Sequence, residues 1–210
     1  VVGKDFDDFK KQLNNLNFNN KLKIDYAIQK IPKDRVKPFG TADAVFQTMD
    51  QIEILKNSSF CVCNSDNLYS TNSLKTIREN AYENAVLAYD RDSLNFPKER
   101  VSSFSILMTD DNFNLLNFIE KPTQEQVDQN LDSNGKIRVS MNIFKFNGLQ
   151  AFDFIKNCPI NPIRNEKELP SAIVNMINEN DLYMKGIPIA EHVPDLTSKA
   201  DINIIQKLIE

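Results

Sequence analysis

The chain has 210 residues, of which 41% are hydrophobic and 26% are charged, and its 25 basic and 29 acidic side chains give a formal net charge of −4. These proportions are typical of a globular domain with one substantial core, and every apolar run is far shorter than the roughly 18 residues that a membrane span requires. Lysine and arginine are nowhere concentrated as on a nucleic-acid surface. We therefore expect a soluble protein that binds neither a membrane nor a nucleic acid.

The three cysteines, Cys61, Cys63 and Cys158, lack the C-x-x-C spacing of a metal or redox site. Cys61 and Cys63 lie two residues apart in an apolar, strand-like run, so they would point to one face of a strand. We interpret them as small buried hydrophobic residues rather than metal ligands. Reduced cysteines suit a cytoplasmic protein.

The first half of the chain alternates between helical and extended patterns, which indicates an α/β sheet. Thr41 is the predicted N-cap of the second helix, and Asn72 or Ser73 that of the third. The continuous apolar run at 60–63 is typical of a central parallel strand covered on both faces. Helices are predicted over 5–16, 41–55 and 73–84, and strands over 22–28, 60–63 and 85–89.

The second half begins with an antiparallel pattern, a predicted hairpin of strands 104–108 and 113–119 around a turn at 110–112. The polar stretch 124–135 is the predicted mobile loop, and Thr197 or Ser198 is the predicted cap of the last helix. The remaining predicted elements are strands over 137–146 and 182–189 and helices over 149–155, 168–177 and 202–209. The whole chain is predicted to be one α/β domain with a mixed, mainly parallel sheet flanked by helices and an antiparallel part.

Two aspartates follow strand-like stretches. Asp66, in Asn64-Ser65-Asp66-Asn67, comes directly after the apolar run, where ligands gather in open α/β sheets. A carboxylate at that place can hold a hard cation, although an acid that caps a turn would have the same pattern. Asp195 also follows a strand and precedes a helix, and its alternative is an ordinary loop acid. His192, the only histidine, is interpreted as structural.

The sequence Glu120-Lys121-Pro122 closes the predicted hairpin. Pro122 favours an extended conformation for Lys121. Neighbouring side chains at a strand end point to opposite faces, so one charge could serve a site while the other is solvated. The alternative is that both charges are simply solvated.

Taken in order, these segments resemble one family, the sugar-1-phosphate nucleotidylyltransferases, also known as nucleoside-diphospho-sugar pyrophosphorylases. The resemblance runs from residue 1 to residue 210 and implies a Rossmann-like mixed sheet. It is carried by Gln29, Lys37-Pro38-Phe39-Gly40-Thr41-Ala42-Asp43-Ala44, Asn64-Ser65-Asp66-Asn67, Glu120-Lys121-Pro122, Val139-Ser140-Met141-Asn142 and Asp195-Leu196-Thr197.

The resemblance implies two functional halves. In residues 1–103, Gln29 would hydrogen-bond the edge of a nucleobase, Gly40 would let the backbone approach that base, and Thr41 would be a further substrate-binding residue. In residues 104–210, three polar residues would bind the sugar, and Lys121 would neutralise its phosphate. The three sugar-binding residues would be Glu120, Ser140 and Asn142.

The implied activity is nucleotidylyl transfer from a nucleoside triphosphate to a sugar-1-phosphate. Asp66 and Asp195 would bind Mg²⁺ and, with Lys121, form the catalytic set. The implied partners are the two substrates and, in a homo-oligomer, further copies of the chain. The sequence does not identify the base or the sugar, because an amide such as that of Gln29 both donates and accepts.

One departure concerns the glycine-rich phosphate loop of the family, which has no counterpart among the five glycines of this chain. We expect that a phosphate-binding segment precedes Val1, or that the protein is a nucleotidyltransferase-like binding or regulatory module without turnover. A third reading is a nucleotide-sugar glycosyltransferase, since Ser65-Asp66-Asn67 is similar to the acid-x-acid motif of those enzymes. That reading leaves Glu120-Lys121-Pro122 without a role.

Overall fold

The computed structural model describes residues 1–3, 6–15, 23–179, 182–197 and 199–209. The chain divides into two compact units, each built from two separate stretches of sequence. The first unit comprises Val1–Ser58 and Gly148–Asn175, and the second comprises Ser59–Asn147 and Met176–Glu210. Within the described ranges, no helix has both the length and the apolar character to span a membrane. The functional halves 1–103 and 104–210 remain a prediction.

The first unit is mainly helical. Its core forms where α2 contacts α6, because Val45 and Met49 fall on one face of α2 and are buried. Phe46 of α2 packs against Phe152 of α6 with 6.1 Å between the centroids of the tilted rings. The elements are α1 (Asp7–Asn15), α2 (Thr41–Gln51), η1 (Glu53–Asn57), α6 (Gly148–Lys156), the short hairpin of β6 (Ile160–Asn161) and β7 (Glu166–Lys167), and the part of α7 (Leu169–Glu179) up to Asn175.

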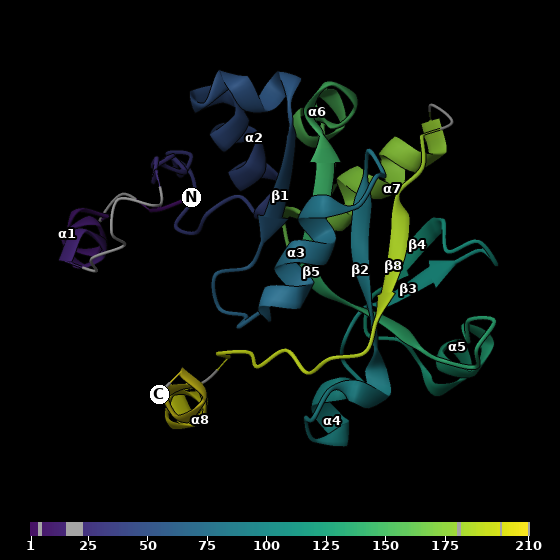
Figure 1. Ribbon diagram of the computed structural model, residues 1–210. Coiled ribbons are helices and arrows are strands. Elements are labelled where there is room, and N and C mark those ends of the chain that lie inside the picture. Colours follow the sequence, from purple (N-terminus) through teal and green to yellow (C-terminus); the bar gives the residue numbers. More distant parts are fainter. Residues whose placement is uncertain (4–5, 16–22, 180–181, 198, 210) are drawn as a thin grey trace. The chain divides into compact units, whose positions relative to one another are not determined.

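The second unit is built on a six-stranded sheet in the order β4-β3-β5-β2-β8, with β1 also paired to β5. The helix α3 (Thr71–Glu79) lies across the sheet at β2 and β5 (Figure 1). Ile77 of α3 is buried against Leu87 and Ile143 of the sheet. The strands are β1 (Ser59–Cys63), β2 (Ala85–Asp90), β3 (Ile106–Thr109), β4 (Leu115–Ile119), β5 (Arg138–Asn147) and β8 (Lys185–Ile189). The remaining elements are η2 (Arg91–Ser93), α4 (Lys98–Val101), α5 (Gln124–Gln129), η3 (Lys199–Asp201) and α8 (Ile202–Ile209).

The α/β class with a mixed, Rossmann-like sheet flanked by helices is confirmed. Among the described pairings of this sheet, β2 and β8 are parallel and the other strand pairs are antiparallel, so the sheet is mixed but not mainly parallel as predicted. The predicted hairpin is present as β3 and β4, and the long strand predicted over 137–146 is β5. The predicted helices over 149–155, 168–177 and 202–209 are present as α6, α7 and α8.

The prediction that 60–63 is a central parallel strand is wrong. Among the described strands β1 pairs with β5 alone, in antiparallel register from Ser59 opposite Asn147 to Cys63 opposite Ile143. Cys61 and Cys63 are exposed rather than buried as predicted, whereas Cys158 is buried. The physical reason is that a short apolar run has the same composition in either strand direction, and only its partner determines which face is covered.

The strand predicted over 22–28 is also wrong in its described part. Leu22 lies outside the described residues, and residues 23–28 form no ladder except a single parallel bridge between Val2 and Ile28. The backbone of Ile28 is instead held by the side chain of Gln51, which donates to its carbonyl at 2.9 Å and accepts from its N–H at 3.0 Å. A side-chain amide here replaces a neighbouring strand.

The polar stretch 124–135 contains a helix rather than the predicted mobile loop. Thr123 and Gln126 form a capping box, in which each side chain accepts a hydrogen bond from the backbone N–H of the other residue. Val127 of this helix, α5, is buried. The buried Val127 and the capping box therefore stabilise a helix in a segment whose polar composition alone is typical of a loop.

Several local predictions differ from the structure at element ends. Gly40, not Thr41, is the N-cap of α2, and Ser70, not Asn72 or Ser73, is the N-cap of α3, where its hydroxyl accepts from the Ser73 N–H at 2.9 Å. Lys121 has a positive φ of 47° rather than the extended conformation predicted from Pro122. The alternative cap Ser198 lies outside the described residues.

Candidate functional site

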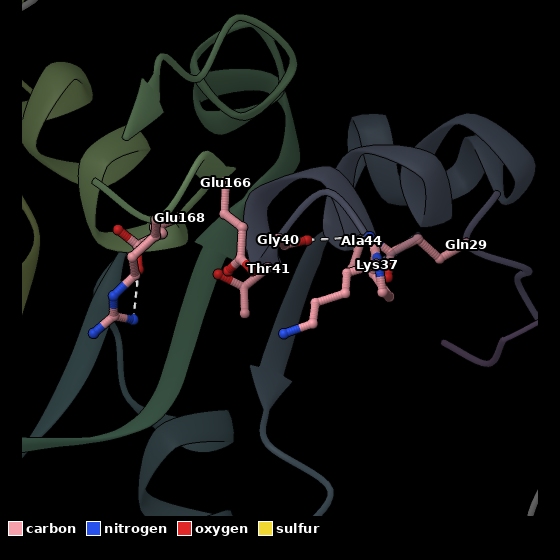
Figure 2. Close-up of a pocket in the computed structure, with 9 residues that line it drawn as sticks. Gln29, Lys37, Gly40, Thr41, Ala44, Glu166 and Glu168 are labelled. Atoms are coloured by element: carbon pink, nitrogen blue, oxygen red, sulfur yellow. Dashed lines mark hydrogen bonds and ion pairs between the residues drawn. The ribbon is translucent and has the colours of Figure 1, made fainter. Parts of the chain in front are cut away.

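The first unit contains a pocket of about 360 Å³ between the segment around Gly40 and the β6–β7 hairpin (Figure 2). Gln29, Gly40 and Thr41, the three residues that the resemblance assigned to nucleotide binding, all line it. The structure therefore brings these three together. The other lining residues are Lys37, Pro38, Ala44, Arg164, Glu166 and Glu168.

Gly40 cannot be replaced without strain, because its φ of 103° lies in the region that favours glycine. A Cβ at this position would come within 2.3 Å of the carbonyl oxygen of Lys167. The Lys167 N–H donates to the neighbouring carbonyl of Phe39 at 2.8 Å, which holds β7 against this turn. The close backbone approach that the resemblance attributed to a ligand is thus made here by the protein's own strand.

Thr41 connects two helices of the first unit. It is the first residue of α2, and its hydroxyl accepts a hydrogen bond at 2.9 Å from the N–H of Leu169, the first residue of α7. The N–H groups of a first helical turn have no partner within their own helix, so this contact satisfies one of them. Thr41 both caps a distant helix and lines the pocket.

The side chain of Gln29 is held by two acceptors. Its Nε2 donates to the carbonyl of Gly40 at 3.1 Å and to Oδ2 of Asp43 at 2.9 Å. Asp43 lies in the first turn of α2. The amide that was predicted to contact a nucleobase is therefore fixed at the pocket by residues of the adjacent turn.

The charged residues of the opposite wall were not found by sequence reasoning. Glu168 accepts from Nη1 of Arg164 at 2.8 Å and from Nδ2 of Asn161 at 2.6 Å. Figure 2 shows the Glu166 side chain extending from β7 toward Thr41. Lys37 belongs to the motif that carries the resemblance, so it could have been predicted as a site residue. No local sequence pattern in the β6–β7 hairpin indicates that the hairpin packs against Gly40.

In the second unit, the segments that contain Asp66 and Asp195 lie side by side. Asn67 and Asp195 form an isolated antiparallel bridge. The Leu196 N–H donates to the Asp66 carbonyl at 2.8 Å, and the Leu68 N–H donates to the Pro194 carbonyl at 2.8 Å. The loop after β1 is thereby joined to the segment after β8.

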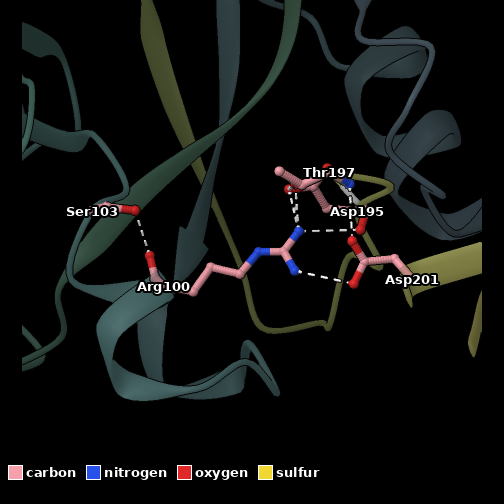
Figure 3. Close-up of polar contacts among 5 residues, drawn as sticks. All are labelled: Arg100, Ser103, Asp195, Thr197 and Asp201. Atoms are coloured by element: carbon pink, nitrogen blue, oxygen red, sulfur yellow. Dashed lines mark hydrogen bonds and ion pairs between the residues drawn. The ribbon is translucent and has the colours of Figure 1, made fainter. Parts of the chain in front are cut away.

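The carboxylate of Asp195 is paired with Arg100, a residue that sequence reasoning missed (Figure 3). Nη2 of Arg100 lies 2.9 Å from Oδ2 of Asp195 and also donates to the Thr197 hydroxyl at 2.6 Å, while Nη1 lies 3.5 Å from Asp201. The guanidinium also lies over the ring of Phe96, 4.5 Å from its centroid. No periodicity or motif marks Arg100, because its partners are distant in sequence.

Tyr69 ties the loop of Asp66 to the central strand β5. Its hydroxyl donates to the carbonyls of Met141 at 2.6 Å and Asn142 at 3.2 Å, and it accepts from the Asn64 N–H at 3.3 Å. Burial raises the pKa of Tyr69, so the hydroxyl keeps its proton and remains a donor. The segment 64–69 is consequently attached to both β5 and the segment after β8.

Of the predicted sugar-binding residues, Glu120 directly follows β4 and Ser140 lies in β5, two strands that are both paired with β3. Ile119 of β4 is in register with Ile106 of β3, which is in register with Val139 of β5. Glu120 and Ser140 each follow one of these residues, so they stand near the same end of the sheet with β3 between them. Ser140 is buried, while Glu120 and Lys121 are exposed.

Asn142 follows two residues later on β5 and is exposed, with a positive φ of 55°. Its N–H donates to the Ser140 hydroxyl at 3.1 Å. The irregular backbone at Asn142 falls where the β2–β5 register shifts, between Val86 and Ala88. This bulge turns part of β5 away from a regular ladder.

The comparison with protein families decides what kind of protein this is. A family model described as nucleotidyl transferase matches residues 3–188. The chain belongs to the nucleotidyl transferase family. The match includes every predicted site residue from Gln29 to Asn142, whereas Asp195 lies beyond it.

Similar proteins carry names of the same chemistry. The nucleotidyl transferase chain is 29% identical over 128 residues to the glucose-1-phosphate adenylyltransferase of Paramagnetospirillum magneticum, which is 59% of this chain and 28% of that protein. It is 30% identical over 84 residues to the glucose-1-phosphate adenylyltransferase of Photobacterium profundum, which is 40% of this chain and 20% of that protein. The chain thus spans between a fifth and a third of the length of these relatives.

The two predicted metal-binding aspartates of this nucleotidyl transferase, Asp66 and Asp195, have different contacts. Within the described part of the chain, no group of three or more histidine, cysteine, aspartate or glutamate residues could hold a metal ion. Asp66 is exposed and its carboxylate has no hydrogen bond or ion pair with described residues. Of the two oxygens of Asp195, Oδ2 contacts Arg100 and Thr197, and Oδ1 contacts neither. Two carboxylate oxygens suit Mg²⁺, which usually takes one or two carboxylates and completes its shell with water and phosphate.

His192 of this nucleotidyl transferase makes packing and hydrogen-bond contacts that fit the structural role predicted for it. Its Nδ1 accepts from the Asn95 N–H at 3.2 Å, and its ring packs edge-on against Phe96 at 4.8 Å. Burial, followed by the nearby Arg100, lowers the pKa of His192 and keeps the ring neutral at pH 7.

Proposed function

We propose that this nucleotidyl transferase moves a nucleotidyl group from a nucleoside triphosphate to a sugar-1-phosphate, giving a nucleoside-diphosphate sugar and pyrophosphate. The observation that carries the proposal is the pairing of the Asp66 segment with the Asp195 segment in a chain of this family. The relatives named as glucose-1-phosphate adenylyltransferases make ATP and glucose-1-phosphate the first substrate pair to test.

The chemistry requires positioning and charge neutralisation more than proton transfer. A phosphate oxygen of the sugar-1-phosphate attacks the α-phosphorus, a new P–O bond forms, and the bond to the β-phosphate oxygen breaks so that pyrophosphate leaves. The attacking oxygen is already anionic, so no general base is needed. The barrier comes from bringing two polyanions together in line.

Residues of the first unit would bind the nucleobase. The pocket at Gln29, Gly40 and Thr41 has walls with both donors and acceptors and a volume of about 360 Å³, within the usual range of small-molecule sites. Lys37 adds a positive charge at the pocket.

Residues of the second unit would bind the sugar phosphate and the metal. Glu120, Ser140 and Asn142 would hydrogen-bond the sugar, and Lys121 would neutralise its phosphate. Asp66 and Oδ1 of Asp195 would hold Mg²⁺, which when bound neutralises phosphate charge as it builds up in the transition state. Arg100 would keep Asp195 oriented through Oδ2.

Release of pyrophosphate on mixing the protein with Mg²⁺, ATP and glucose-1-phosphate tests this function, with other nucleotides and sugar phosphates as further pairs. Asp66→Asn is expected to lower turnover at least about 100-fold, the scale of losing one group that stabilises transition-state charge. Asp111→Asn, an exposed aspartate in the β3–β4 turn, is the matched control. Nucleotide binding without any pyrophosphate release would instead favour a binding module without turnover, and equal rates for Asp66→Asn and the wild type would contradict the assigned metal role.

A further inference from the structure

Resting on the proposed function, we infer that Asp43 and Gln47 are positioning residues that fix the Gln29 amide so that its oxygen, and not its NH₂ group, is offered to a nucleobase. The pocket would then select a base edge that presents an N–H group to Gln29. This property comes from contacts around Gln29 rather than from Gln29 itself, since a free amide could turn over and present either group.

Both hydrogens of the Gln29 amide have acceptors. One is donated to the Gly40 carbonyl at 3.1 Å and the other to Oδ2 of Asp43 at 2.9 Å, and the contact to Gly40 can be followed in Figure 2. Oε1 accepts no hydrogen bond from the described residues. A carboxylate and a carbonyl only accept, so turning the amide over would place Oε1 against two acceptors and lose both bonds.

Asp43 is itself held in place. Oδ2 also accepts from Nε2 of Gln47 at 2.8 Å, one turn further along α2. Gln47 is anchored in turn to the backbone of Lys30, because its Oε1 accepts from the Lys30 N–H at 2.8 Å and its Nε2 donates to the Lys30 carbonyl at 3.0 Å. The carboxylate that orients Gln29 therefore cannot rotate without breaking contacts on both sides.

The backbone of Gln29 is fixed in the same way. Gln51 makes a two-way contact with Ile28, as Gln47 does with Lys30, so α2 holds the residues on both sides of Gln29. Four residues of helix rise about 6 Å, and two residues of extended chain rise roughly 6.6 Å. Gln47 and Gln51, four residues apart on α2, are therefore spaced to contact Lys30 and Ile28, two residues apart on the extended segment. Gln29 lies between these two contacts, and its side chain reaches Asp43.

A fixed Gln29 amide can be tested with pairs of nucleotides whose bases have nearly the same shape but different hydrogen-bonding groups. CTP and UTP, like ATP and ITP, differ by exchanging a donor and an acceptor on the same edge with little change in shape. A fixed acceptor separates the members of such a pair by roughly 10-fold to 100-fold, because the wrong member leaves two acceptors facing each other. An amide that is free to turn over would bind both nucleotides of a pair with similar affinity.

Asp43→Asn is the decisive variant, because an asparagine can donate to Oε1 and so permits the turned-over amide. Dissociation constants of CTP, UTP, ATP and ITP would be measured by calorimetry for the wild type, for Asp43→Asn and for the control Asp50→Asn, an exposed aspartate on α2 that pairs with Lys56. We expect the CTP:UTP and ATP:ITP affinity ratios to move at least about 10-fold toward unity or to invert in Asp43→Asn, and to stay unchanged in the control. Gln47→Met, which removes the second donor to Asp43, should move them the same way by a smaller factor.

A merely structural role of Asp43 would weaken both members of each pair equally, and unchanged ratios in a folded Asp43→Asn protein overturn the inference while leaving the proposed function intact. If the wild type binds none of the four nucleotides, the proposed function and this inference both fail. The orientation also has a ligand-free readout, slow hydrogen exchange of the Gln29 side-chain NH₂ in the NMR spectrum. Fast exchange in the wild type would contradict the fixed amide.

Discussion

Asn67 and Asp195 pair as an isolated antiparallel bridge although they come from opposite ends of the second unit's sequence. The hydrogen bonds on either side of this bridge, from Leu196 to Asp66 and from Leu68 to Pro194, make a short two-stranded connection. The pairing places both predicted metal-binding aspartates on one small element. The two side chains have different surroundings, since Asp195 has a cationic partner and Asp66 has none among the described residues.

Removing that partner should have two opposite effects. Arg100→Met leaves Asp195 and Asp201 without their guanidinium, and because the Arg100 and Asp195 side chains are only 24% and 17% exposed, we expect unfolding free energy to fall by about 1–3 kcal/mol. Magnesium should bind more tightly to the variant, because the Asp195 carboxylate no longer shares its charge. Thermal unfolding at a series of Mg²⁺ concentrations measures both effects. Lys98→Met, on the same short helix, is the control, and equal Mg²⁺ stabilisation of Arg100→Met and the wild type would contradict the prediction.

Thr41 should contribute to stability through α7 rather than through α2. Thr41→Val keeps the shape but leaves the Leu169 N–H without its acceptor, which should lower the free energy of unfolding by about 0.5–2 kcal/mol. Thr41→Ser retains the hydroxyl and should lie close to the wild type. Urea unfolding of the three proteins measures the difference. A Thr41→Val protein as stable as Thr41→Ser would contradict the role assigned to this hydrogen bond.

Glu191 should make the stability of the second unit depend on pH in the acidic range. Burial by itself would raise the pKa of Glu191, but hydrogen bonds from Ser70, Asn72 and Ser73 at the start of α3 lower it below its ordinary value of 4.5. The unfolded chain therefore takes up a proton at a higher pH than the folded one. The stabilisation is fully present above pH 4.5 and is lost as the pH falls through the folded pKa.

In Glu191→Gln this contribution to the pH dependence should disappear, and stability at pH 7 should fall by about 1–2 kcal/mol because an amide accepts hydrogen bonds more weakly than a carboxylate. Chemical unfolding at pH 7, 5, 4 and 3 gives the comparison. Glu99→Gln, an exposed glutamate of α4, should keep the wild-type slope. Parallel pH curves for Glu191→Gln and the wild type would exclude the role assigned to these hydrogen bonds.

Elements with a strong local pattern could be predicted from the sequence. The β3–β4 hairpin has apolar residues on both sides of Asp110, whose carboxylate accepts from the N–H groups of Asn112 and Asn114 and so closes the turn locally. Helix α2 has Val45 and Met49 on one face. The ordered series of short motifs indicated the family, and the family match over residues 3–188 confirmed it.

The predictions that were wrong concern residues whose contacts are made with partners distant in sequence. Thr41 has the residue type of an N-cap and acts as one, but for α7 rather than for its own helix. Residues 23–28 have the alternation of a strand, yet the backbone of Ile28 bonds to the Gln51 side chain, and the segment's described backbone pairing is a single bridge to Val2. Arg100 and Tyr69 organise the Asp66 and Asp195 segments through partners far away in sequence, and no local pattern encodes such contacts.

Tyr69 gives a test of whether the Asp66 loop must be held against β5. Tyr69→Phe removes a hydroxyl that donates to the carbonyls of Met141 and Asn142 and accepts from the Asn64 N–H, so these backbone groups lose a partner in a half-buried place. We expect unfolding free energy to fall by about 1–3 kcal/mol. Because the loop with Asp66 loses its attachment to β5, the Mg²⁺ concentration needed for half-maximal pyrophosphate release should rise.

The control for this variant is Tyr82→Phe, because Tyr82 is exposed and its ring lies near Lys185 without a hydrogen bond from its hydroxyl to described residues. It should leave both the stability and the Mg²⁺ dependence unchanged. If Tyr69→Phe is destabilised but keeps the wild-type Mg²⁺ dependence, the hydroxyl stabilises the sheet without positioning Asp66. A shift in Mg²⁺ dependence larger than that of an equally destabilised Val45→Ala protein separates positioning of the Asp66 loop from a general loss of stability, since Val45 is a core residue of the other unit.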